Sequence, residues 1–174
     1  MVASPALADP NFRQTVVLIL SGNDEETFGI VLNRQSDKQI SEIWEQIFET
    51  PCRTKQLIHL GGPVFGPLIA LHTTEAFADA EVLPGLYFST QKESIEAVVD
   101  EKHSFRLYVG GAGWGKKQLK AEIQQGAWLP IPAMIGDAFD DPTELWEKTL
   151  DRAGRGVLSS MLHQRVLPED PSLN

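Results

Sequence analysis

Residues 110–117, GGAGWGKK, carry most of the phosphate-loop pattern of nucleotide-binding proteins. In such a loop backbone N–H groups surround the phosphates, a lysine reaches the terminal phosphates, and a following hydroxyl residue binds Mg²⁺. Gly110, Gly115 and Lys116 stand at the expected positions, but Lys117 replaces the hydroxyl residue. Trp114 also stands where a bulky side chain would compete with the phosphates. The sequence therefore argues against an ATP or GTP site.

Two other interpretations of this stretch stay open. Lys116, Lys117 and Lys120 stand at the start of an expected helix. The positive end of a helix can hold a carboxylate or a phosphate there. Alternatively, the glycines of residues 110–115 make a sharp turn from a strand into the helix, and Trp114 fills part of the core. Of the two, we favour the turn.

The expected helix carries a polar pair, Gln118 and Glu122, four residues apart. Side chains at this spacing share a helix face. The pair can face a groove beside the turn at residues 61–63, or it can be an ordinary exposed pair, and the sequence does not decide between them. If the groove exists, Glu122 is a candidate base for an enzyme that acts on a small anionic metabolite.

Three further polar residues lie at the ends of expected strands. Asn33 closes the second strand and Arg34 follows it, and each is either a ligand contact or a turn residue. For Asn33 we favour the turn, because asparagine tolerates turn geometry well. His72 ends an apolar strand, a position more typical of a hydrogen-bonded core histidine than of a catalyst.

The sequence offers no recognisable catalytic or metal centre. No serine stands in a nucleophile-elbow pattern, and no carboxylate pair is placed for acid–base chemistry. Cys52 is the single cysteine, and no cysteine–histidine cluster has zinc spacing. We therefore predict no catalytic residues, no metal and no cofactor.

Composition limits the partners of the protein. The 174 residues suit one domain, and 15 Lys and Arg against 24 Asp and Glu leave a net charge of −9. An acidic surface repels nucleic acids and anionic membranes, so the net charge argues against DNA binding. The N-terminus lacks the pattern of a signal peptide, and no apolar run is long enough to cross a bilayer. We expect a cytoplasmic protein.

Hydrophobic periodicity predicts both strands and helices. Strands are expected at 15–20, 27–33, 56–60, 67–73, 85–89 and 104–110, with the first two forming a hairpin. Helices are expected from Ile40 to the residues before Pro51, after Thr90, from about Lys116, and from about Asp141 to Gly154. This mixture predicts an α+β domain with a mixed or largely antiparallel sheet.

Several stretches together resemble the AlgH (YqgE-like) family. They are ADPNFRQTVVLIL, FGIVLNR, HLGGPV, ALHT and GGAGWGKKQLKAEIQQGAW, and the resemblance runs from about Leu7 to Gly154. It implies one compact bacterial cytosolic domain, whose bifurcated sheet folds towards a pseudo-barrel flanked by helices. We place that domain at residues 1–156, followed by a C-terminal segment, 157–174, with a frayed end.

The resemblance implies no established biochemical activity; the family name comes from a proposed role in regulating alginate production. This chain also departs from the family pattern. Gly22 stands where relatives often carry a histidine, Gly111 where they often carry an aromatic residue, and Lys116 and Lys117 replace a frequent Pro-Gly pair.

These observations favour a non-enzymatic regulatory protein that binds a small ligand or a protein partner. The two alternatives are an enzyme with Glu122 as its acid or base, and a DNA-binding regulator, which the net charge disfavours. The oligomeric state stays open. The candidate site residues are Asn33, Arg34, Gly61, Gly62, Pro63, His72, Gly113, Trp114, Gln118 and Glu122.

Overall fold

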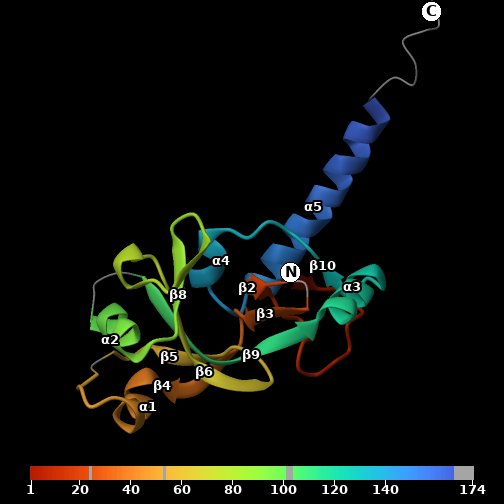
Figure 1. Ribbon diagram of the computed structural model, residues 1–174. Helices are drawn as coiled ribbons and strands as arrows, with labels where there is room; N and C mark the ends of the chain where they lie inside the picture. The colour runs from red at the N-terminus through yellow and green to blue at the C-terminus, as the bar shows by residue number, and fades with distance from the viewer. Residues whose placement is uncertain (24, 53, 101–103, 167–174) are drawn as a thin grey trace, which may run out of the picture.

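The long strand β9 (Phe105–Gly115) lies at the centre of an eight-stranded sheet (Figure 1). The computed structural model describes all residues except 24, 53, 101–103 and 167–174. On one side β9 pairs antiparallel with β6 (Val64–His72). On the other side its first half pairs parallel with β5 (Leu57–Leu60), and its second half pairs antiparallel with β3 (Glu26–Val31). The sheet therefore forks at β9, which confirms the predicted bifurcation.

The main path of the sheet runs β2-β3-β9-β6-β8-β7 and curls until its ends approach each other. Residues 17–19 of β2 and 82–83 of β7 line one pocket, so the two end strands lie side by side. The sheet is thus a nearly closed, largely antiparallel barrel. The remaining bounds are β1 Val2–Ala3, β2 Val17–Gly22, β4 Gln35–Gln39, β7 Ala80–Leu83, β8 Leu86–Ser89 and β10 Trp128–Leu129.

Five α-helices and one short 3₁₀ turn surround the barrel in the described residues. The helices α1 and α2 pack on one face of the sheet, where Trp44 and Ile95 meet Leu107. The helix α3 follows β9 directly, and α4 and α5 lie at the opposite side of the molecule from α1 (Figure 1). Their bounds are α1 Ile40–Ile47, α2 Lys92–Asp100, α3 Lys116–Gln124, α4 Ile135–Phe139, α5 Leu145–Val166, and Glu75–Phe77 for the 3₁₀ turn. The α+β prediction is confirmed.

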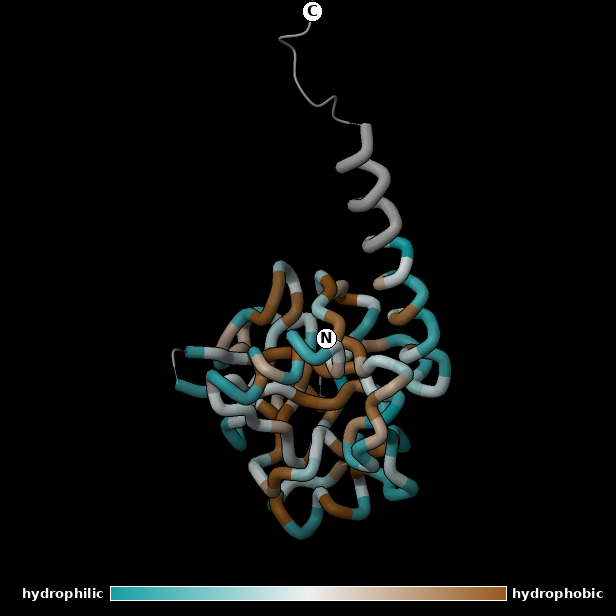
Figure 2. The backbone as a smooth tube through the Cα atoms, turned by 90° about the vertical axis from the view of Figure 1, so that its right-hand side faces the viewer, coloured by the Kyte–Doolittle hydropathy of each residue, from teal (hydrophilic) through white to brown (hydrophobic). Residues whose placement is uncertain are grey.

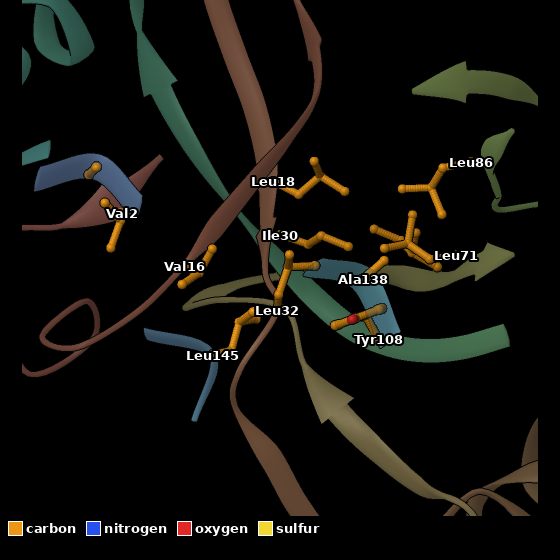
Figure 3. Close-up of a cluster of buried hydrophobic side chains, with 12 residues drawn as sticks. Val2, Val16, Leu18, Ile30, Leu32, Leu71, Leu86, Tyr108, Ala138 and Leu145 are labelled. Carbon is orange, nitrogen blue, oxygen red and sulfur yellow. The ribbon is translucent and has the colours of Figure 1, made fainter. Parts of the chain in front are cut away.

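The core follows from the alternation of side chains along the strands. On β9, Phe105 and Leu107 face α1 and α2, whereas Tyr108 faces the barrel interior. Figure 3 shows Tyr108 among side chains from β2, β3 and β6 and from the α4 region. Apolar segments accordingly gather in the body of the molecule, and hydrophilic segments lie at its periphery (Figure 2). Among the described residues, no helix has the length and hydropathy that a membrane span requires.

The glycine-rich stretch is a strand and not the predicted turn. Residues 112–115 pair with β3, and α3 begins only at Lys116. Gly110 adopts a φ of 72°, a conformation that favours glycine, so the strand bends there and continues. The last helix is also longer than predicted: α5 does not stop at Gly154 and continues to Val166. The predicted fraying of the chain end falls on residues 167–174, outside the described residues.

Candidate functional site

A carboxylate on α3 binds two tryptophan side chains. Glu122 Oε2 accepts hydrogen bonds from Nε1 of Trp114, at 3.1 Å, and from Nε1 of Trp128, at 2.8 Å. Its other oxygen, Oε1, accepts a hydrogen bond from Gln118 Nε2 at 2.9 Å. We call these four residues the tryptophan–glutamate cluster. Three of them were predicted site residues, and Trp128 was missed.

The two tryptophans of the tryptophan–glutamate cluster are part of the hydrophobic core. Trp114 and Trp128 are only 2% and 1% exposed and meet edge to face, with ring centroids 5.8 Å apart. Phe12 packs against both rings at 5.6 and 5.5 Å. A buried indole N–H needs an acceptor, and the carboxylate supplies one for each ring. The cluster therefore joins β9, α3 and β10 into one unit, with every indole N–H paired.

The two glycine-rich segments cross each other at backbone distance. Gly61 N donates to Val109 O at 2.8 Å, and Gly61 O accepts from Val31 N at 2.7 Å. A Cβ atom on Gly61 would collide with the carbonyl of Gly110, and one on Gly62, whose φ is 150°, with the carbonyl of Gly111. At these glycines the two segments therefore lie so close together that no side chain fits between them. Pro63 and Gly113 are near this crossing in the sequence, and both are exposed.

Asn33 and Arg34 line a pocket of about 570 Å³ on a different part of the surface. Three separate segments of the chain contribute with them: the loop before β2, the end of β5, and the turn before α5. We call it the arginine pocket, and its lining residues are Arg13, Gln14, Asn33, Arg34, Gln35, Leu60, Pro142 and Thr143.

Hydrogen bonds hold the wall of the arginine pocket in place. Asn33 Oδ1 accepts from Val16 N at 2.9 Å, and Asn33 Nδ2 donates to Gln14 O at 2.9 Å. Arg34 Nη2 donates to the carbonyls of Pro10, at 3.1 Å, and Arg13, at 3.3 Å. Asn33, which follows β3, therefore connects the end of this strand to the loop before β2. In that loop Gln14 has the left-handed φ of 54°, which is uncommon for a residue other than glycine.

Behind the arginine pocket lies a buried polar group on β5 and β9. The rings of His59 and Tyr108 are 5.3 Å apart, and Arg106 Nη2 donates to the carbonyls of Phe139 and Asp140 at 3.0 and 2.8 Å. Burial lowers the pKa of His59 to about 4, and Arg106 adds to this effect. Burial also raises the pKa of Tyr108. At neutral pH both rings are therefore uncharged, and Arg106 carries the charge.

His72 lies apart from these groups. Its Nε2 is 2.9 Å from Ser89 Oγ, and its Nδ1 accepts from Thr74 N at 3.3 Å. Since Ser89 Oγ donates to the Phe77 carbonyl, the His72 Nε2 carries the proton that is donated to Ser89. Burial lowers the pKa of this histidine. The ring is fully buried and its hydrogen bonds are complete, so it stabilises the β6–β8 pairing.

Another cavity lies between α1 and α2. It measures about 600 Å³, and its lining includes Cys52, Thr50 and Glu96. Glu96 Oε1 accepts from Thr50 Oγ1 at 2.6 Å, and no histidine or cation is among the described residues that line it. The described residues also contain no group of three His, Cys, Asp or Glu side chains arranged to hold a metal.

The comparisons with known proteins agree on one family. The AlgH-like family model matches residues 1–157. A UPF0301 protein of Thermobifida fusca is 35% identical over 193 aligned residues, covering 100% of this chain and 93% of the relative. The UPF0301 protein PSPA7_0505 of Pseudomonas paraeruginosa is 36% identical over 154 residues, covering 83% and 80%. This chain belongs to the AlgH-like family.

Solved structures of AlgH-like proteins share the fold. The solution structure of AlgH from Pseudomonas aeruginosa superposes with a TM-score of 0.72 at 30% identity, covering 97% of this chain and 92% of that one. The crystal structure of DIP2367 from Corynebacterium diphtheriae gives a TM-score of 0.68 at 28% identity, covering 87% and 83%. The names of these relatives state no biochemical activity.

In this AlgH-like chain, the predicted site residues separate into four places. Trp114, Gln118 and Glu122 form the cluster, and Asn33 and Arg34 line the arginine pocket. Gly61 and Gly62 make the backbone crossing, and His72 lies in the core. Sequence reasoning missed Arg13, Leu60 and Thr143, because nothing in their local patterns shows that three distant segments meet.

Proposed function

We propose that this AlgH-like chain is a non-enzymatic regulatory protein and that it binds a small ligand in the arginine pocket. One observation carries the proposal: Asn33 and Arg34 line a ligand-sized cavity while their own hydrogen bonds hold its wall in place. Ligand pockets usually measure about 300–1,000 Å³ and are largely pre-formed, and a wall held in this way meets that requirement.

The hydrogen bonds of Glu122 favour a ligand-binding protein over an enzyme that uses this carboxylate as its base. A general base needs a free lone pair directed at the proton it removes. Both carboxylate oxygens of Glu122 already accept hydrogen bonds, and two of the three donors are buried indoles. The two indoles hold Oε2 within the core, whereas Oε1 accepts only from the exposed Gln118. The carboxylate therefore serves chiefly to hold the two indoles, which favours a structural role for Glu122 over acid–base catalysis.

Net charge argues against the second alternative, a DNA-binding regulator. At −9, the chain repels a phosphate backbone at long range. The arginine pocket is a local concave feature, and its shape suits a small molecule better than a duplex.

A fragment screen read by ¹H–¹⁵N NMR tests the proposal on the full chain. A library of neutral and charged fragments should shift the amides of Gln14, Arg34 and Thr143, and the Arg34→Lys variant should reduce those shifts. Glu122→Gln is the matched control, because it alters the other candidate site and should leave pocket binding unchanged. The proposal fails if no fragment shifts the pocket amides, or if the responding amides are those of residues 114–122.

A further inference from the structure

We infer that the arginine pocket takes an anion, namely a small molecule that bears a carboxylate or a phosphate group. This inference rests on the proposed function, since it names the chemical class of ligand for the same pocket. It depends on charge, on the hydrogen bonds of Arg34, and on what surrounds the pocket.

The charge of the pocket is opposite to that of the chain. The chain as a whole carries −9, yet the described lining includes two arginines, Arg13 and Arg34, and no aspartate or glutamate. Among the described residues, neither arginine has a carboxylate within salt-bridge distance. The pocket is therefore a cationic site on an acidic protein, and a site of this kind attracts small anions.

The contacts of Arg34 orient its guanidinium without neutralising it. Nη2 donates to two backbone carbonyls, which are neutral acceptors. Nε is buried and has no acceptor among the described residues. A partly buried cation without a counter-charge is costly, and a bound carboxylate or phosphate would offset that cost. A guanidinium also suits these two groups, because charge-assisted hydrogen bonds to a carboxylate or a phosphate are stronger than hydrogen bonds to neutral acceptors.

The contrast with Arg152 shows what a neutralised arginine looks like in this protein. Arg152 Nη1 and Nη2 donate to Asp137 Oδ1 and Oδ2 at 2.9 and 2.7 Å, a bidentate ion pair. Its pKa is raised chiefly by the hydrogen bonds to Asp137. Arg34 has the same kind of fork, but its acceptors are carbonyls. Because Nη2 of Arg34 already donates to two carbonyls and Nε is buried, Nη1 is the nitrogen with which this guanidinium can meet an anionic ligand.

The opposite wall contributes little to binding the anion directly. Thr143 donates both its N–H and its hydroxyl to Asp141 Oδ1, at 2.8 and 2.6 Å, so these donors are occupied. Those hydrogen bonds lower the pKa of Asp141, so a carboxylate stands beside this wall and repels an anion. The anion must therefore bind on the side of Arg13 and Arg34. With about 570 Å³ available, the pocket has room for a molecule larger than the anionic group itself.

The test compares pairs of probes that differ in charge. Succinate is paired with succinamide, and glycerol 3-phosphate with glycerol, each titrated into the full chain at low salt with NMR detection. We expect the two anions to shift the amides of Gln14, Arg34 and Thr143, and the neutral probes not to do so. The stronger of the two anions then shows whether carboxylate or phosphate is preferred. Added NaCl at 0.5 M should weaken binding at least several-fold by screening and competition.

Matched variants distinguish anion binding in the pocket from a general effect of the net charge. Arg13→Gln and Arg34→Lys should each weaken anion binding about tenfold, the first by removing charge and the second by removing the Nη1 donor and the carbonyl contacts that orient it. Arg155→Gln, on the exposed face of α5, changes net charge equally and should have no effect. Since Arg34 also holds the loop before β2, Arg13→Gln keeps the test valid if Arg34→Lys fails to fold.

The outcomes distinguish this inference from the proposed function. If the neutral probes or neutral fragments shift the pocket amides as strongly as the anions do, the pocket binds ligands but the anion assignment is wrong. The assignment is also wrong if Arg155→Gln weakens binding as much as Arg13→Gln. If neither fragments nor anions shift the pocket amides, both the anion assignment and the proposed function fail.

Discussion

The tryptophan–glutamate cluster and the arginine pocket are two polar regions of this molecule, and they differ in how their charges are paired. In the cluster, the carboxylate of Glu122 accepts three hydrogen bonds, two of them from buried indoles. In the pocket, the guanidinium of Arg34 is held by carbonyls and has no carboxylate partner among the described residues. The cluster is thus complete within the chain, whereas the pocket keeps a charge that a ligand can neutralise.

This difference shows that residue type alone does not identify a functional site. Glu122 is the kind of side chain that performs chemistry, yet here it accepts the hydrogen bonds of two core indoles. A buried polar network that is fully satisfied stabilises one packing arrangement. A guanidinium without a charged partner at a cavity can gain a charge-assisted hydrogen bond from an anionic ligand. The predictions below test this comparison by removing one member of each region.

Removing an indole from the tryptophan–glutamate cluster should have the largest effect on the free energy of unfolding. Trp128→Ala should lower the free energy of unfolding by about 3–5 kcal/mol, because it leaves a cavity beside Trp114 and Phe12. Trp128→Phe keeps most of the ring and should cost about 1–3 kcal/mol, mainly for the lost hydrogen bond to Glu122. Urea denaturation followed by circular dichroism measures both. Equal losses for Ala and Phe, or a loss below about 1 kcal/mol for Ala, would show that the cluster is not a structural centre.

Acid should destabilise the protein through the buried histidine behind the arginine pocket. The pKa of His59 is lowered to about 4 in the fold, against an ordinary value of 6.5. The unfolded chain therefore takes up this proton first, and the stability that the neutral ring contributes is fully present above pH 6.5 and is lost as the pH falls towards 4. At pH 4.5 the loss should be about 2–3 kcal/mol relative to pH 7.5.

The control for this pH effect is the His59→Gln variant, which does not titrate at this position. Carboxylates titrate in the same range in both proteins, so the quantity to compare is the difference between the two pH dependences from urea denaturation. We expect the variant to lose about 2–3 kcal/mol less than the parent between pH 7.5 and 4.5. An identical pH dependence would mean that the imidazole behind the pocket is not held in its neutral form.

Changing an arginine of the pocket should have the smallest effect on stability. Arg13 is exposed, and its side chain has no ion pair among the described residues, so Arg13→Gln should change the free energy of unfolding by less than about 0.5 kcal/mol. The same urea assay, run beside Trp128→Ala, gives the contrast directly. If Arg13→Gln destabilises the chain by more than about 1 kcal/mol, the arginine is structural and the distinction between the two regions is lost.

Sequence reasoning predicted the parts of the fold that depend on local pattern. The apolar runs around Val17 and Ile30 form the expected hairpin, and the spacing of Ile40 and Trp44 marks the buried face of α1. It was wrong about residues 110–115, where glycine content suggested a turn. Glycine allows a turn but does not require one, and here the partner strands β3 and β6 keep the segment extended.

By itself, then, the sequence determined the family, the α+β class and the main strands and helices, because these depend on periodicity and on motifs that are continuous in the chain. Only the tertiary structure decided which polar side chains meet. Glu122 finds Trp128 because β10 returns beside α3, and Arg34 lines a pocket with Arg13, Leu60 and Thr143 because the barrel brings distant segments together. Spacing along one helix or strand predicts neighbours on that element, whereas a site built from several segments depends on how the sheet closes.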